Sequence, residues 1–132
     1  MSATVNELVT KADPISKVVI GAAIEVHRHL GPGLLESAYQ SCLAHELNAQ
    51  GVRFLREVAL PVTYKGTLLD CGYRMDFVVE DLLVLEIKAV ESLSKIHEAQ
   101  LLSYLRLSGK PLGLLINFHV PLLRDGIKRL AL

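Results

Sequence analysis

Two charged residues stand inside an otherwise apolar part of the sequence. Glu86 and Lys88 belong to the segment Leu82–Ala89, whose other members are all apolar. Such a run is typical of a central strand that is covered on both sides. Because successive side chains of a strand point to opposite faces, these two residues share one face, about 6–7 Å apart along the strand. Charged side chains are rarely buried unless they are paired or functional, so both are candidate site residues.

A third candidate, Asp76, precedes this segment. From Leu69 to Val79 the odd-numbered residues are apolar, and Asp76 is among the polar residues at even positions. This alternation predicts a strand with Asp76 on its polar face. Glu80-Asp81 is a turn signal, so we expect the two strands to form an antiparallel hairpin.

The length of the turn decides whether the two carboxylates meet. Directly opposed residues of an antiparallel pair share a face. A two-residue loop at Glu80-Asp81 would pair Asp76 with Leu85, on the wrong face. A loop of three or five residues centred on Asp81 pairs Asp76 with Glu86 instead. We therefore expect an odd-numbered loop, or a bulge that restores this register.

In that register the Cβ atoms of Asp76 and Glu86 lie about 5 Å apart. Two carboxylates this close repel each other unless a positive charge lies between them. Mg²⁺ suits such a pair, because it binds through one or two carboxylates and completes its shell with water and phosphate oxygens. Lys88 could orient an attacking water or stabilise negative charge on the phosphate. The three residues thus predict metal-dependent phosphate chemistry.

The remaining sequence predicts the elements that must hold these residues. The order is α-α-β-β-β-α-β, an α/β sandwich around a mixed sheet in one domain over residues 13–132. The expected elements are a polar arm or short helix over 1–12, a helix from Asp13-Pro14 to Leu30, a stop at Gly31-Pro32-Gly33, a helix over 34–50, a strand over 52–64 bent at Pro61 and followed by a turn at Lys65-Gly66, strands over 69–79 and 82–89, a helix from Ser92 or Ser94 to Gly109, a strand over 112–118, and a turn at Asp125-Gly126 before a short last strand.

The sequence resembles a known group of nucleases. Asp76, nine intervening residues and then Glu86-Ile87-Lys88 resemble the motif of the PD-(D/E)XK nuclease superfamily, with Arg74-Met75-Asp76 where Pro-Asp would stand. The stretch from Gly33 to Tyr39 is similar to the signature of the small bacterial and archaeal GxxExxY proteins of that superfamily. The resemblance extends from about Ile15 to Leu130. It implies a restriction-endonuclease-like αβββαβ core with one extra N-terminal helix.

The resemblance also implies roles for individual residues. Asp76 and Glu86 would be metal carboxylates, with the Ile87 carbonyl as a backbone ligand. Lys88 would be the catalytic lysine, and Glu36 would supplement the metal site from its helix.

Further residues would complete that site. Gln100 and Tyr104 resemble the QxxxY element of RecB-like members, which faces the site, and His97 lies on the same helical stripe, within reach of substrate. Gly33 would serve the backbone turn, and Tyr39 would lie in the core with its hydroxyl bonded near the site.

Composition limits how the protein could hold a nucleic acid. Fourteen Lys and Arg balance fourteen Asp and Glu in the 132 residues, so the net charge is zero. The overall field therefore cannot drive binding to nucleic acid or to a membrane, and only a local patch could. We expect such a phosphate-contacting patch from Arg53, Arg56, Lys65 and Arg74.

No signal peptide and no apolar run near 20 residues stand in the sequence, and two cysteines make no disulfide framework. These features favour a cytoplasmic protein without a membrane partner.

The sequence leaves two functional classes open. The first is hydrolysis of phosphodiester bonds in DNA or RNA with Mg²⁺ or Mn²⁺. The second is a binding or assembly module that keeps the fold without turnover, such as a homodimer or a subunit that needs a partner. Structural alternatives also stand: Glu36 could complement a helix dipole, Glu86 and Lys88 could be a plain ion pair, and Gln100 and Tyr104 could be ordinary helix surface.

Overall fold

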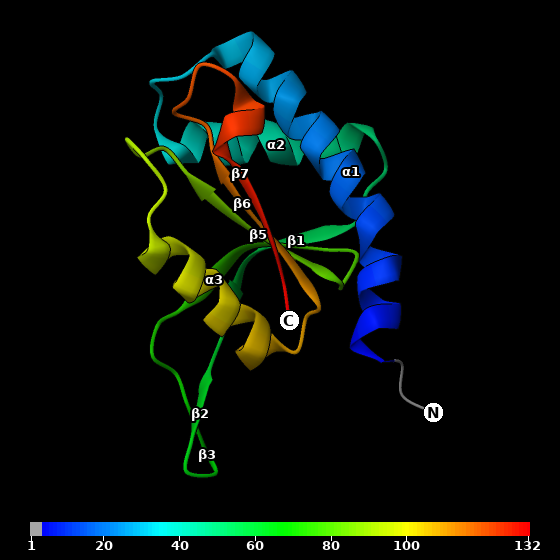
Figure 1. The fold of residues 1–132 in the computed structure, drawn as a ribbon, viewed down its shortest axis with the longest axis vertical. Helices are drawn as coiled ribbons and strands as arrows, with labels where there is room; N and C mark the ends of the chain where they lie inside the picture. Colours follow the sequence, from blue (N-terminus) through cyan, green and yellow to red (C-terminus); the bar gives the residue numbers. More distant parts are fainter. Residues whose placement is uncertain (1–3) are drawn as a thin grey trace.

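The computed structural model describes residues 4–132, so the first three residues of the expected N-terminal arm lie outside the described residues. The described residues form three α-helices and seven strands (Figure 1). In chain order the elements are α1 (Val5–Leu30), α2 (Glu36–Ala49), β1 (Phe54–Ala59), β2 (Val62–Tyr64), β3 (Thr67–Leu69), β4 (Arg74–Val79), β5 (Leu83–Lys88), α3 (Lys95–Ser108), β6 (Leu112–Asn117), the 3₁₀ helix η1 (Leu123–Gly126) and β7 (Ile127–Ala131).

Five strands form one mixed sheet in the order β1-β4-β5-β6-β7. β5 and β6 are parallel, and every other neighbouring pair in this sheet is antiparallel. A parallel pair needs a long crossover connection, which α3 provides. β5 is the middle strand, and its first five residues, Leu83–Ile87, are all buried. The α/β architecture and the central position of this apolar strand are therefore confirmed.

Different helices cover the two faces of the sheet. α1 and α2 pack on one face, in a core that includes Leu85. α3 packs on the other face, where Tyr104 belongs to a smaller core together with Val84. Because side chains alternate along β5, Glu86 and Lys88 point to the same face as Val84. The candidate site therefore lies on the α3 side of the sheet.

α1 begins about two turns earlier than the sequence predicts. The Thr4 side chain accepts a hydrogen bond from the Glu7 amide, and the Glu7 carboxylate accepts one from the Thr4 amide. This capping box satisfies two amides that a helix start leaves unpaired. Ala12 is fully buried in the core under α1 and α2 and anchors the early turns. The expected start at Asp13-Pro14 is wrong, because Pro14 is accommodated inside the helix.

The strand expected over Leu69–Val79 is interrupted by a loop at residues 70–73. The Asp70 carboxylate accepts a hydrogen bond from the Gly72 amide at 2.9 Å, and Gly72 has a φ of 78°. The residues before this loop pair with β2 as a separate hairpin, turned at Lys65-Gly66, which projects from the body of the molecule in Figure 1. The alternation of apolar residues continued through the loop, so periodicity alone could not show the break.

The other predicted boundaries agree closely with the structure. Pro61 separates β1 from β2, and α2 lies within the expected range. α3 follows the cap residue Ser94 and ends before Gly109, which has a left-handed backbone with a φ of 73°. The expected turn at Asp125-Gly126 falls in η1, and the expected last strand is β7.

Candidate active site

The β4–β5 hairpin brings Asp76 and Glu86 to the same level of the sheet. Val79 pairs with Leu83, so the loop between the strands has three residues and is centred on Asp81. This is one of the two loop lengths that the sequence predicts. Continuing the same register, Asp76 lies opposite Glu86.

At this level the strands are joined through the two carboxylates. The Asp76 amide donates to Glu86 Oε2 at 3.2 Å, and the Ile87 amide donates to Asp76 Oδ2 at 2.8 Å. Each carboxylate therefore accepts a backbone hydrogen bond from the neighbouring strand. These bonds restrict both side chains and hold the two carboxylates side by side.

Burial and mutual repulsion make Glu86 hard to ionise. The residue is 4% exposed. The pKa of Glu86 is raised from 4.5 to about 9. Burial is the main cause, the negative charge of Asp76 contributes to the rise, and the Lys88 charge opposes it. Glu86 therefore retains its proton at neutral pH.

Lys88 ends β5 on the same face and is half-buried. No carboxylate within residues 4–132 lies within the 4.0 Å of its ammonium that an ion pair requires. The plain Glu86–Lys88 ion pair that the sequence left open is therefore not formed. Lys88 instead offers a cationic donor beside the acidic pair.

Asn117 fixes the chain just after Lys88. It lies beside Lys88 in the parallel β5–β6 pair and is 1% exposed. Its side-chain oxygen accepts from the Val90 amide at 3.0 Å, and its side-chain nitrogen donates to the Val90 carbonyl at 2.9 Å. Both hydrogen bonds hold the segment that leads from β5 towards α3.

α3 presents polar side chains towards the acidic pair. Gln100 Nε2 donates to the Tyr104 hydroxyl at 3.0 Å. Burial raises the pKa of Tyr104, and the negative charge of Glu86 raises it further, which indicates that the hydroxyl lies near that carboxylate. His97 uses Nδ1 to accept from the Ser94 amide at 3.1 Å and so caps the helix.

His97, Gln100 and Tyr104 line one hollow of about 440 Å³, which we call the α3 pocket. Val62 of β2 and Tyr73 of the loop before β4 form part of its opposite wall. The structure thus brings all three predicted α3 residues to one pocket on the same face of the sheet as the acidic pair, and their contact with a substrate stays a prediction.

Comparison with family models gives a decisive match. The model described as PD-(D/E)XK nuclease superfamily covers residues 13–130. The chain belongs to the PD-(D/E)XK nuclease superfamily. No curated protein and no solved structure gives a significant match. The narrower resemblance to GxxExxY proteins is not tested by the family model and stays a prediction.

The acidic pair of this PD-(D/E)XK protein has the chemistry that a divalent cation needs. Two carboxyl groups held side by side supply hard oxygen ligands. Within residues 4–132 no group of three or more His, Cys, Asp or Glu side chains is arranged to hold a metal ion. Asp76 and Glu86 would therefore need backbone oxygen, water or substrate to complete a coordination shell.

Glu36 is not brought into a three-acid group with Asp76 and Glu86 in the described part of the chain. It is the first residue of α2, where an acidic side chain also complements the helix dipole. Its role as an additional ligand stays a prediction.

Gly33 and Tyr39 shape the chain before Glu36. Gly33 has a φ of 104°, which residues with a side chain rarely adopt. Tyr39 is fully buried, and its ring stacks on Phe118 with centroids 4.5 Å apart. Its hydroxyl donates to the Gly31 carbonyl at 2.6 Å and accepts from the Leu34 amide at 3.1 Å. Tyr39 is therefore a core residue that fixes the loop between α1 and α2.

The expected arginine patch is not formed. Arg53 forms an ion pair with Glu80 at 3.0 Å, at the turn end of the β4–β5 hairpin. Arg56 instead lies 5.4 Å from the centre of the Phe77 ring, on the α1–α2 face. Lys65 is at the turn of the β2–β3 hairpin, and only Arg74 belongs to β4 near Asp76. The four residues follow one stretch of sequence, but strand alternation and the hairpin separate them.

Two residues of this region were not predicted from the sequence. Asn117 reads as the polar end of an apolar strand, and its bonds to Val90 depend on the β5–β6 pairing. Tyr73 reads as a core residue of a continuous strand, yet it is 44% exposed in the α3 pocket. The Asp70 and Gly72 turn signals near Tyr73 could have indicated the loop.

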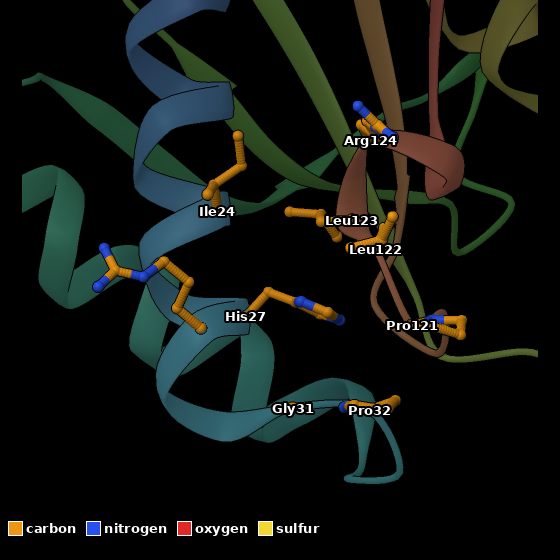
Figure 2. A pocket seen from close by; sticks show the side chains of 9 residues that line it. Ile24, His27, Gly31, Pro32, Pro121, Leu122, Leu123 and Arg124 are labelled. Atoms are coloured by element: carbon orange, nitrogen blue, oxygen red, sulfur yellow. The ribbon is translucent and has the colours of Figure 1, made fainter.

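A hollow larger than the α3 pocket, of about 560 Å³, lies elsewhere (Figure 2). Ile24 and His27 of α1 face Leu122 and Leu123 across it. None of the predicted catalytic or metal-binding residues lines this hollow, so size does not identify the active site here.

No helix in residues 4–132 combines the length and apolarity needed to span a membrane.

Proposed function

We propose that the protein is a metal-dependent nuclease that hydrolyses phosphodiester bonds in DNA or RNA, using Mg²⁺ or Mn²⁺. The observation that carries this proposal is the placement of Asp76 and Glu86 side by side, with Lys88 on the same face. Membership of the PD-(D/E)XK nuclease superfamily supports the same reaction class. Arg74 and the polar residues of the α3 pocket are the proposed substrate contacts.

In this proposal Asp76 and Glu86 would hold the cation, and the Ile87 carbonyl would contribute a further oxygen. A bound cation would lower the pKa of a coordinated water and offset negative charge on the phosphate. Glu86 would release its proton to solvent on binding the cation, because the added positive charge favours the carboxylate.

Lys88 and the α3 residues act on the substrate side. The Lys88 ammonium donates hydrogen bonds to the attacking water or to a phosphate oxygen, and it stabilises the negative charge that develops there. Gln100 and the Tyr104 hydroxyl, already hydrogen-bonded to each other, orient the substrate beside the acidic pair.

The direct test is cleavage by purified wild type, Asp76→Asn and Lys88→Ala. Single-stranded DNA, duplex DNA and RNA are incubated with Mg²⁺, Mn²⁺ or EDTA. We expect metal-dependent cleavage by wild type and a loss of about 10²-fold or more in both variants. Asp81→Asn is the matched control, because Asp81 is exposed at the turn of the same hairpin. This variant should cleave like wild type.

Two outcomes would reject the proposal. Equal cleavage by wild type, Asp76→Asn and Lys88→Ala would mean that the activity belongs to another site or to a contaminant. A folded wild-type protein that binds metal but cleaves none of the substrates would favour a non-catalytic binding or assembly module, such as a homodimer or a subunit that requires a partner. Circular dichroism of every variant separates loss of activity from loss of fold.

A further inference from the structure

The α3 pocket lies on the same face of the sheet as the acidic pair, although neither Asp76 nor Glu86 lines it. Tyr104 forms part of the pocket wall and also packs in the small core with Val84 and Met75. These core residues are close neighbours in sequence of Glu86 and Asp76 on the same two strands. A group seated in the pocket would therefore lie beside a phosphate held at the acidic pair.

The lining of the pocket combines two tyrosines with aliphatic and polar side chains. Tyr73 is 44% exposed, and its ring meets Tyr104 edge to face with centroids 6.0 Å apart. Gln100, Ser103 and His97 add an amide, a hydroxyl and an imidazole, and no Lys, Arg, Asp or Glu of the described chain lines the pocket. Such a surface suits a planar group with hydrogen-bonding edges and does not suit a phosphate.

A nucleobase has these properties, and it can enter a pocket only when it is unpaired and unstacked. Proteins commonly bind single strands by stacking bases on aromatic side chains. The net charge of zero and the separation of Arg53, Arg56 and Lys65 provide little support for holding both backbones of a duplex. Both the charge of the protein and the chemistry of the pocket therefore favour a single-stranded substrate.

We propose that the α3 pocket binds an unpaired nucleobase next to the scissile phosphate, with Tyr73 as the stacking residue, so that the substrate is single-stranded at the cleaved bond. This proposal rests on the proposed nuclease function and specifies its substrate. Tyr73 positions the substrate, and Lys88 and the acidic pair act on the phosphate.

Fluorescence anisotropy tests this proposal without requiring hydrolysis. A labelled 12-nucleotide single strand, the same strand in a duplex, and a single strand carrying one abasic position are titrated in EDTA and in Ca²⁺. We expect the single strand to bind at least tenfold more tightly than the duplex. Tyr73→Ala should weaken single-strand binding about 5- to 150-fold, and Tyr73→Phe should stay within twofold of wild type because it retains the ring.

Tyr64→Ala is the matched control, because Tyr64 is exposed on β2 and does not line the pocket. Equal affinity for single strand and duplex, an unchanged Tyr73→Ala variant, or no binding to any oligonucleotide would overturn the proposal. If cleavage depends on Asp76 but Tyr73→Ala binds the single strand as tightly as wild type, this inference is rejected and the nuclease function is retained. Binding that depends on Tyr73 without cleavage under any metal would reject the nuclease function instead.

Discussion

Glu86 is an acid whose surroundings oppose its charge. It is buried under α3, it lies beside Asp76, and the Lys88 charge offsets this only partly. A buried carboxyl with a like charge beside it either keeps its proton or acquires a cation. The residue therefore couples protonation, metal binding and stability at one position.

The pH dependence of stability tests this coupling. The pKa of Glu86 is about 9 in the folded state and about 4.5 when the chain is unfolded. The folded protein therefore binds more protons between these values, and its free energy of unfolding falls as pH rises, by up to about 1.4 kcal/mol per pH unit. Urea unfolding in EDTA at pH 5, 7 and 9 should show this fall.

Glu86→Gln is the control, because glutamine keeps the shape and cannot titrate. Its free energy of unfolding should depend less steeply on pH than that of wild type. A wild-type stability that rises from pH 5 to pH 9, or an equal slope in the glutamine variant, would contradict the assigned environment of Glu86.

At the scale of single residues, sequence spacing predicted the positions that depend on one hairpin. Asp76 and Glu86 meet because three residues form the loop, and strand alternation gives Lys88 the same face. Asn117 and Tyr73 could not be found this way, because their roles depend on a parallel neighbour and on a helix that packs across the sheet. The predicted arginine patch was wrong for the same reason, because residues that are close in sequence lie on different faces of the sheet.

At the scale of elements, the loop between α1 and α2 is held by one buried side chain. The Tyr39 hydroxyl bonds both the Gly31 carbonyl and the Leu34 amide. Tyr39→Phe should lower the free energy of unfolding by about 1–2 kcal/mol, since it removes both hydrogen bonds and retains the stacked ring.

Tyr64→Phe is a matched control for urea unfolding, because Tyr64 is 59% exposed on β2. It should change the free energy of unfolding by less than about 0.5 kcal/mol. Equal stability of both variants would show that the Tyr39 hydroxyl does not hold the loop.

Most helices and strands were predictable because their ends carry local signals. Gly109, Pro61 and Lys65-Gly66 all mark boundaries that the structure confirms. The start of α1 was not predictable from Asp13-Pro14, because burial of Ala12 and the Thr4–Glu7 capping box extend the helix past a proline. The separate β2–β3 hairpin was concealed because apolar alternation continued across residues 70–73.

At the scale of the whole molecule, neutrality limits how a nucleic acid can be held. Equal numbers of positive and negative residues give no net attraction to phosphates. Binding should depend on a few local contacts, such as Lys88 and Arg74, together with stacking in the α3 pocket.

Salt dependence measures the number of these contacts. The logarithm of the binding constant for a single strand should fall with a slope of only about −1 to −2 against the logarithm of salt concentration. Arg74→Ala should make the slope shallower by about 0.7, whereas Arg124→Ala, beside the hollow in Figure 2, should leave it unchanged. A slope steeper than about −5 would require many more phosphate contacts than Lys88 and Arg74 provide, and would contradict this prediction.

Calorimetric titration with Mn²⁺ at pH 8 tests most directly whether Asp76 and Glu86 share one divalent cation. Wild type and the Asp81→Asn control should each bind one ion at this site with proton release, and Asp76→Asn and Glu86→Gln should each weaken that binding at least tenfold. Failure of wild type to bind Mn²⁺, or binding that neither Asp76→Asn nor Glu86→Gln weakens, would contradict the metal site.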